Sequence, residues 1–171
     1  VEPTKFPLVG ERFVGANSGD NLGSGIALSA DGKTLAIGTS GRDLGEVGDQ
    51  LSNNGRVDIY YLEDNAWVVK GLPIIGSGAG DRLGGRAVSM SDDGNIIAVG
   101  SPFNDESGLD AGKTNIYEWD GESWQEKGMP IFGSVSNGKG GMGVHISGSG
   151  STLVVSEVHG NGVQVYEWDS G

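Results

Sequence analysis

The chain repeats one pattern three times along its length, and this repetition constrains the fold more than any other feature. The segment LGSGIALSADGKTLAIG (22–38) returns as LGGRAVSMSDDGNIIAVG (83–100) and, more weakly, as MGVHISGSGSTLVVS (142–156). A loop rich in Gly, Asn and Asp follows each copy, and then comes a run that ends in aromatic residues. Self-similarity with a period of roughly 50 to 60 residues indicates a repeat architecture.

Each repeat is predicted to consist of short β-strands joined by tight turns. The chain has 33 glycines in 171 residues, and they separate short runs of Val, Ile, Leu and Tyr, which is typical of an all-β protein with many turns. Asp31-Gly32 and Asp93-Gly94 stand between apolar runs, and Gly148-Ser149-Gly150 occupies the same place in the third repeat. Asp-Gly in that position predicts a hairpin, because Gly adopts positive φ at little cost. A further strand is expected over 57–61, 114–119 and 163–168. No segment has a 3.6-residue apolar period, so essentially no helix is expected.

An outer strand is predicted to complete the first two repeats. Residues 65–71 and 123–128 each contain a Trp and precede a segment with Pro, and Pro is compatible with an edge strand. Four antiparallel strands per repeat form the blade of a β-propeller. We therefore expect an all-β fold of three four-stranded antiparallel blades, with one blade split between the N- and C-termini. The single repeat domain covers residues 1–171, with repeats at about 22–82, 83–141, and 142–171 plus 1–21.

The third repeat lacks its outer strand, and a matching pattern is found at the other end of the chain. GANSGDNLG (15–23) matches GSGAGDRLG (76–84), and an apolar stretch with Pro precedes it. Propellers typically have four or more blades, so we expect this stretch to add to the third blade of another copy, giving a ring or a filament. The expected assembly strand contains Phe6, Pro7, Leu8, Val9, Phe13 and Val14. The expected receiving edge contains Val163, Val165, Tyr166 and Trp168.

The repeat sequences resemble those of a known family of secreted proteins. GDRLGGRAVSMSDDGNIIAVGSPFND (80–105) and KTNIYEWDGESWQEKG (113–128) are similar to the FG-GAP-like propeller repeats of large bacterial and algal surface proteins, whose relatives include the integrin alpha-subunit propeller. The resemblance implies an extracellular propeller used for adhesion or as a scaffold, without a common enzymatic activity. The calcium-binding blades of this family carry Asp-x-Asp-x-Asp-Gly hairpins, whereas this chain has SADGKT, SDDGNI and SGSGST. Calcium needs six to eight oxygen ligands, so we do not expect it at these hairpins.

Composition restricts the partners and the cellular location. The formal net charge is -12, from 11 Lys and Arg against 23 Asp and Glu. This acidity disfavours binding to nucleic acid. There is no Cys and no apolar run of transmembrane length, so we expect neither disulfides nor membrane insertion. The chain begins at Val1, and we expect a processed chain or a piece of a longer one.

Acidic loops are the candidate cation sites. The segment 104–110 contains three carboxylates, and Asp105 and Asp110 are the ligands we would expect for calcium, although solvated loop charge also explains them. Asp43, Glu46 and Asp49 occupy the equivalent loop of the first repeat. Otherwise no cofactor is expected.

Two other patterns are not expected to form sites. The run Gly108–Thr114 is one residue short of a phosphate-binding loop and leads into a strand instead of a helix. His145 and His159 have no third ligand nearby in the sequence, and we expect the first to be partly buried and the second to be exposed.

Three classes of function are left open by these patterns. The first is an extracellular structural or scaffold protein that assembles with its own copies head to tail. The alternative is an adhesion or glycan-binding module, in which Trp67 and Trp124 would stack on sugar rings instead of packing in the blades. An enzyme is the third class, but no nucleophile, acid or base is singled out by position, so we expect the protein not to be an enzyme.

Overall fold

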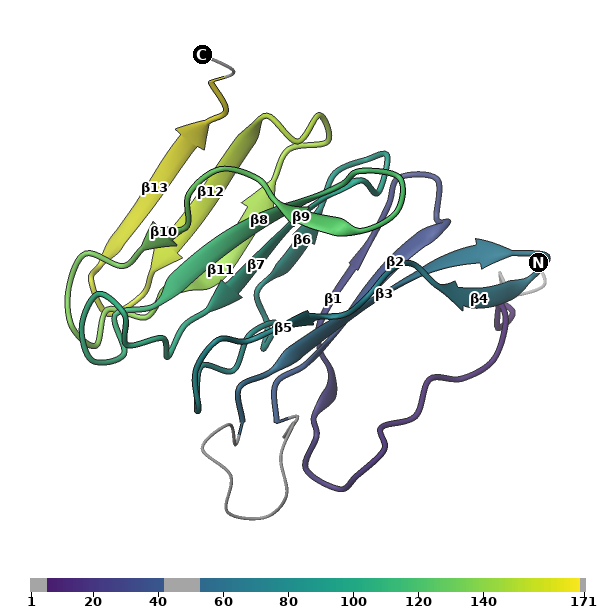
Figure 1. Ribbon diagram of the computed structural model, residues 1–171, viewed down its shortest axis with the longest axis horizontal. Helices are drawn as coiled ribbons and strands as arrows, with labels where there is room; N and C mark the ends of the chain where they lie inside the picture. The colour runs from purple at the N-terminus through teal and green to yellow at the C-terminus, as the bar shows by residue number, and fades with distance from the viewer. Residues whose placement is uncertain (1–5, 42–52, 170–171) are drawn as a thin grey trace, which may run out of the picture.

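Three antiparallel β-sheets follow one another along the molecule (Figure 1). The structure is a computed structural model, and it describes residues 6–41 and 53–169. Each sheet corresponds to one sequence repeat, which confirms the prediction of an all-β fold built of propeller blades. No helix in the described ranges is long and apolar enough to cross a membrane.

The first blade has a fourth position that two short strands share. Its order is β1-β2-β3-β4, and β5 also pairs with β3. The strand β4 pairs with the second half of β3 at Tyr60–Glu63, whereas β5 pairs with the first half at Arg56 and Val57. The five strands are β1 (Leu22–Leu28), β2 (Thr34–Thr39), β3 (Arg56–Glu63), β4 (Ala66–Val69) and β5 (Ile74–Ile75).

The second blade repeats this arrangement, and the third blade contains its first three strands. In the second blade β9 and β10 both pair with β8, as β4 and β5 do with β3. Its strands are β6 (Val88–Met90), β7 (Ile96–Ser101), β8 (Lys113–Trp119), β9 (Trp124–Glu126) and β10 (Ile131–Phe132). The third blade has the order β11-β12-β13, with β11 (Gly140–Ile146), β12 (Thr152–Glu157) and β13 (Gly162–Glu167).

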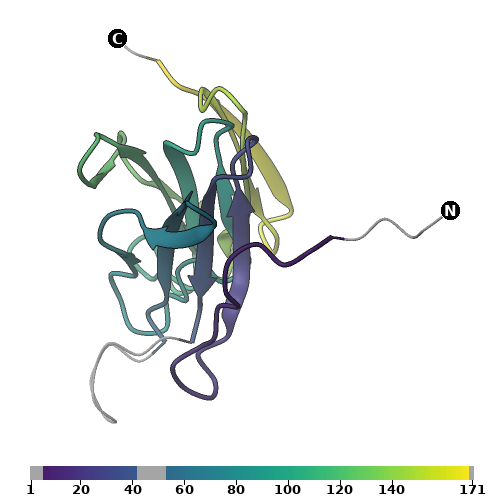
Figure 2. The ribbon, with the colours of Figure 1, turned by 90° about the vertical axis from the view of Figure 1, so that its right-hand side faces the viewer.

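The expected fourth strand of the third blade is not supplied by the N-terminal segment of the same chain. Residues 6–15 lie beside the first blade in irregular conformation, at the opposite end of the molecule from β13 (Figure 1). Figure 2 looks onto this end and shows the N-terminal segment along the first blade.

The predicted hairpin turns are stabilised in the same way in the first two blades. The Ser29 hydroxyl donates to Asp31 Oδ1 at 2.6 Å, and the Thr34 N–H donates to Ser29 Oγ at 2.8 Å. Ser91 and Asp93 repeat the first bond, also at 2.6 Å. Gly32 and Gly94 have φ of 71° and 68°, which explains why Gly follows Asp.

The core lies between the blades. Val57 and Ile59 of the first blade are buried against Val88, Ile97 and Val99 of the second. At the next interface Ala98 of the second blade packs against Ile146, Leu153 and Val155 of the third. The second sheet packs against the first blade with one face and against the third blade with the other. Because side chains alternate along a strand, its strands carry apolar residues on both faces.

Main-chain hydrogen bonds also join neighbouring blades at their turns. The Ala30 N–H donates to the carbonyl of Asp92 at 3.0 Å, and the Asp92 N–H donates to the carbonyl of Gly148 at 2.9 Å. These three residues occupy the same position in the three turns, so the blades are linked by a repeated contact.

Candidate functional site

Each outer blade face exposes apolar side chains whose equivalents are buried at an internal interface. Ile26 on the free face of the first blade is 67% exposed, whereas Val88, its equivalent in the second blade, is 8% exposed. Val165 on the free face of the third blade is 64% exposed, whereas its equivalent Ile59 is 1% exposed. We call the first surface the head face (Ile26 and Leu28) and the second the tail face (Val163 and Val165). Both faces therefore have the chemistry of a blade interface without a neighbouring blade in the described chain.

The N-terminal segment contacts the head-face blade in the way that later segments contact their blades. The indole N–H of Trp67 donates to the carbonyl of Val9 at 3.1 Å, and the indole N–H of Trp124 donates to the carbonyl of Lys70 at 2.9 Å. Gly10 and Gly71, the next residues, have φ of 70° and 78°. Residues 9–15 are thus the structural equivalent of residues 70–76.

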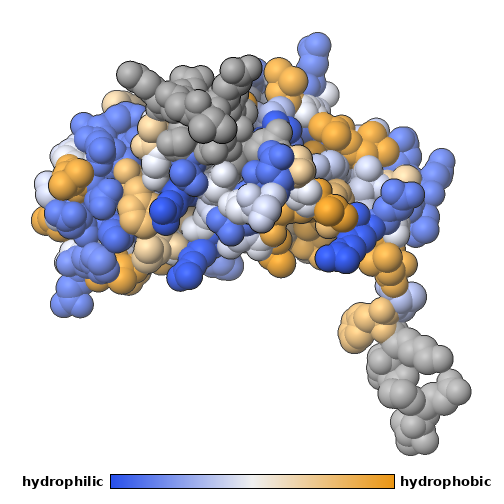
Figure 3. Space-filling model, turned by 90° about the horizontal axis from the view of Figure 1, so that it is seen from below, coloured by the Kyte–Doolittle hydropathy of each residue, from blue (hydrophilic) through white to orange (hydrophobic). Residues whose placement is uncertain are grey.

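The residues of the predicted assembly strand have different environments. The Phe13 ring lies 4.8 Å from the ring of Tyr60 in the first blade. Its equivalent, Ile74, packs in the same way against the second blade. Phe6, Leu8 and Val14 are exposed. Figure 3 shows several hydrophobic residues gathered where the N-terminal segment leaves the body. Pro7 is also exposed.

The predicted receiving edge is divided between the two faces of the third blade. Val163 and Val165 lie on the tail face. Tyr166 packs against the core shared with the second blade, and Trp168 contacts Gly128 of the preceding linker. The alternation of side chains along a strand explains this division.

His145 differs from the expectation that it is partly buried. It is exposed on the third blade, at the position of Ser89 in the second. Ser89 is covered by the third blade and accepts the Ile146 N–H at 2.9 Å, but nothing in the described chain covers His145. His159 is exposed, as expected.

The acidic loop of the second repeat holds its charges with internal partners. Asp105 Oδ1 accepts the N–H of Asp110 at 2.7 Å. Glu106 accepts Lys113 Nζ at 2.6 Å, and this bond is the main reason why the pKa of Glu106 is lowered. Over residues 6–41 and 53–169, no three His, Cys, Asp or Glu side chains gather to hold a metal. A calcium site at Asp105 and Asp110 stays a prediction, and Asp43, Glu46 and Asp49 lie outside the described residues.

The four tryptophans lie at the junctions between the blades and their linkers. The rings of Trp124 and Trp119 lie 5.4 Å apart at an interplanar angle of 56°, and Lys70 Nζ lies 5.3 Å from the Trp124 ring centroid. Trp67 and Trp124 both use their indole N–H groups internally. Trp119 and Trp168 contact Gly71 and Gly128 respectively, so they occupy equivalent positions. Sugar stacking by Trp67 and Trp124 stays a prediction.

Glu157 provides a buried carboxylate that the repeat pattern does not predict. Asp81 accepts the Gly78 N–H in the second repeat, and Gly138 stands at the equivalent of Asp81 in the third. The side chain of Glu157 reaches into that place from the end of β12 and accepts the Val135 N–H. The missing Asp of the third repeat was the only sequence signal that another residue must satisfy these donors.

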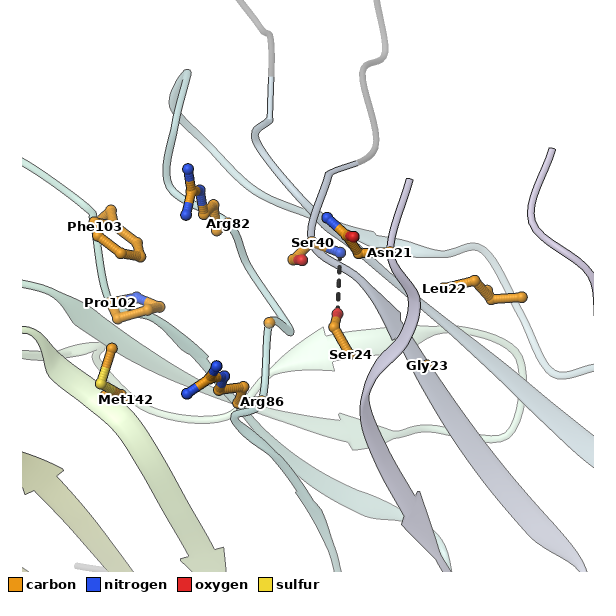
Figure 4. A pocket seen from close by; sticks show the side chains of 11 residues that line it. Asn21, Leu22, Gly23, Ser24, Ser40, Arg82, Arg86, Pro102, Phe103 and Met142 are labelled. Atoms are coloured by element: carbon orange, nitrogen blue, oxygen red, sulfur yellow. Dashed lines mark hydrogen bonds between the residues drawn. The ribbon is translucent and has the colours of Figure 1, made fainter. Parts of the chain in front are cut away.

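A hollow lies where the ends of the three blades meet, and the charged residues that line it, Arg82 and Arg86, are both basic in an acidic protein. It has a volume of about 630 Å³. Arg82 lies over the ring of Phe103 at 4.8 Å, and Arg86 and Met142 also line the hollow (Figure 4). Lys139 Nζ also lies over this ring, 4.6 Å from its centroid. This arrangement has the charge to hold an anionic group.

Comparisons with known proteins show the fold and no family. No protein-family model and no curated protein matches the chain. Among solved structures it is similar to Kuenenia stuttgartiensis hydrazine synthase, with a TM-score of 0.57, 13% identity, and coverage of 88% of this chain and 46% of that one. It is also similar to the periplasmic gluconolactonase of Pseudomonas aeruginosa, with a TM-score of 0.49, 16% identity, and coverage of 85% and 39%. The chain thus spans less than half the length of these structures. The likeness to hydrazine synthase, a β-propeller protein, agrees with three sheets of the propeller-blade type.

Proposed function

We propose that this protein is an extracellular structural or scaffold protein of FG-GAP-like propeller blades that assembles with its own copies head to tail. The observation that carries the proposal is the exposure of Ile26 and Val165, whose equivalents are buried at the internal interfaces. Burying a Val or Ile side chain stabilises an interface by about 1.5–3 kcal/mol. The tail face of one copy and the head face of the next together have the two halves of an internal interface.

Strand pairings within the first two blades also suggest the register of this contact. Ile74 pairs with Val57, and Ile131 pairs with Thr114. The same relationship between copies places Phe13 opposite Val163 and Val14 opposite Gly162. At the turns, the Gly148 N–H would donate to the carbonyl of Ala30, as Asp92 donates to Gly148. The contact is heterologous, so it generates a ring or a filament.

The test is sedimentation of the intact chain over a range of concentrations, with variants of each face. We expect Val165→Asp and Ile26→Asp each to abolish growth. Leu109→Asp is the matched control, because Leu109 is similarly exposed in a loop away from both faces. A mixture of the two face variants retains one intact head and one intact tail, and should form a one-to-one pair that grows no further. A monomeric intact chain at all concentrations, or a mixture that does not pair, contradicts the proposal.

The basic hollow favours a second candidate, an adhesion module that binds acidic glycans. Arg82 and Arg86 make no ion pair with a carboxylate among the described residues, and Arg82 lies beside the aromatic face of Phe103. A glycan array should then show binding to sulfated or carboxylated sugars that Arg86→Ala weakens at least tenfold. Binding confined to neutral glycans contradicts this candidate.

A further inference from the structure

The outer strands of the first two blades bring one tryptophan each to the same place. Trp67 in β4 is paired with Leu62, and Trp124 in β9 is paired with Trp119 at the end of β8. Each indole N–H donates to a carbonyl of the linker that crosses the blade, Val9 in one case and Lys70 in the other. The tryptophan therefore fastens its own blade to the linker from the preceding repeat.

The surroundings of Trp124 define the environment that such a tryptophan requires. The ring lies 5.4 Å from Trp119 and 5.3 Å from Lys70 Nζ, and its edge contacts Gly71. It also packs against the core between the first two blades, beside Tyr117. Gly71 has φ of 78°, and a side chain there would meet the two indole rings.

The third blade has the same environment around a hollow of about 180 Å³. Lys127 Nζ lies 4.4 Å from the ring of Trp168, as Lys70 lies over Trp119. Gly128 has φ of 75° and contacts Trp168, as Gly71 contacts Trp119. Apolar cavities of about 150 Å³ hold an aromatic ring in other proteins. The hollow is lined by Lys127, Gly128, Ile131, Leu153, Tyr166 and Trp168, among others.

The edge of β13 beside this hollow has no strand partner in the described chain. β13 pairs with β12 alone, whereas β8 pairs with β7 on one side and with β9 on the other. Glu167 is exposed at the equivalent of Glu118, which forms an ion pair with Lys127 at 2.7 Å. An added strand with Lys three residues after its Trp would bring that Lys within ion-pair distance of Glu167, as Lys127 is of Glu118.

We propose that this hollow and the adjoining edge of β13 bind an extended, tryptophan-bearing peptide segment with the pattern Trp-x-x-Lys-Gly. The segment adds antiparallel to Tyr166–Trp168, its indole fills the hollow and its indole N–H donates to the carbonyl of Lys127. The hollow continues the interface between the second and third blades, because Ile116, Ile131 and Ile146 line both. The proposed head-to-tail contact uses Gly162 and Val163, the other half of the same edge, so the two contacts are separate.

The probe is a ten-residue peptide with the sequence of residues 120–129, DGESWQEKGM. Fluorescence anisotropy of the labelled peptide should show saturable binding to the intact chain, and the peptide with Ala at the position of Trp124 should bind at least tenfold more weakly. Glu167→Lys should weaken the original peptide severalfold and should favour a peptide with Glu in place of its Lys. Val165→Asp should leave peptide binding unchanged even where it abolishes assembly.

A second experiment does not require the free peptide to bind tightly. The same segment is joined to the C-terminus through a flexible linker, which gives an effective concentration in the millimolar range. The fused segment should raise Tm, and the fused version with Ala in place of Trp should not. If the Trp and Ala segments have the same effect in both experiments, or if backbone amide shifts map the peptide away from Ser151, Tyr166 and Trp168, the proposal is wrong.

Discussion

Glu157 accepts the backbone N–H of Val135 at 3.0 Å, and this bond replaces the one that Asp81 accepts from Gly78 in the preceding repeat. The same carboxylate also accepts the N–H and the hydroxyl of Ser134, both at 2.7 Å. Glu157 is buried, and its equivalents in the first two blades are Thr39 and Ser101. A carboxylate is therefore retained at this linker although it comes from a different strand.

Removal of this carboxylate should destabilise the fold. We expect Glu157→Ala to lower the free energy of unfolding by about 2 kcal/mol, because buried donors lose their acceptor. The hydrogen bonds of Ser134 are the main reason why the pKa of Glu157 is lowered. Since the folded pKa lies below the unfolded value, this stabilisation is present above the unfolded pKa of about 4.3 and is lost as the pH falls through the folded pKa. Urea unfolding at pH 7 and at acid pH should show the difference between wild type and variant shrinking with acidity.

A substitution at Gly138, combined with Glu157→Ala, tests whether the two positions share one carboxylate site. A Cβ at Gly138 would overlap Glu157 Oε1, so Gly138→Asp alone should destabilise the protein. In the Glu157→Ala background the new Asp can instead provide the carboxylate from the position of Asp81. We expect the double variant to be at least about 1 kcal/mol more stable than the sum of the single effects predicts. Simple additivity would mean that the two positions do not share one carboxylate site.

The turn glycines should differ in their tolerance of a side chain. Gly32 and Gly94 both have positive φ, so alanine should cost about 1 kcal/mol or more at either position. A Cβ at Gly94 would also lie 2.6 Å from Thr34 Cβ of the first blade, whereas no described atom lies within 4 Å of a Cβ at Gly32. Thermal unfolding should therefore show a larger loss of Tm for Gly94→Ala than for Gly32→Ala. Equal losses would indicate that the turns do not pack between blades.

Thr114 is a position where substitution should stabilise the protein. Its hydroxyl is fully buried and has no hydrogen-bond partner among residues 6–41 and 53–169, and its equivalent in the first blade is Val57. Thr114→Val should raise the free energy of unfolding by about 1 kcal/mol, because it removes an unsatisfied buried hydroxyl without changing the shape. Val57→Thr should lower it by a similar amount. Chemical denaturation of both variants checks the pair, and a destabilised Thr114→Val protein would contradict the prediction.

Ser91 should control the ionisation of the second hairpin turn. The hydrogen bond from Ser91 is the main reason why the pKa of Asp93 is lowered. Ser91→Ala should raise this pKa toward the ordinary value of 3.8, and NMR titration of the Asp93 carboxyl measures it. Asp31, which has the same bond from Ser29, should keep its lowered pKa in this variant. A parallel shift of both groups would point to a general change in the protein instead of a local one.

The local elements of the fold could be predicted from the sequence because their causes are local. Asp31-Gly32 and Asp93-Gly94 form the predicted turns, because the ability of glycine to adopt positive φ depends on the residue itself and not on its tertiary contacts. The repeats and the two-residue alternation likewise indicate the strands and the number of blades, because both are visible in the sequence itself. The predicted strand over 163–168 begins and ends within one residue of β13.

The positions of side chains between blades were decided only by the tertiary structure. Val88 and Ile26 are equivalent in sequence, yet one is buried and the other exposed, because a neighbouring sheet covers only the first. His145 is exposed for the same reason. In the third repeat Glu157 takes the role of Asp81, although it lies 22 residues along the chain from Val135, whose N–H it accepts. No local sequence pattern identifies a partner that only packing brings close. Local conformation follows from each residue and its neighbours, whereas burial depends on which surfaces meet.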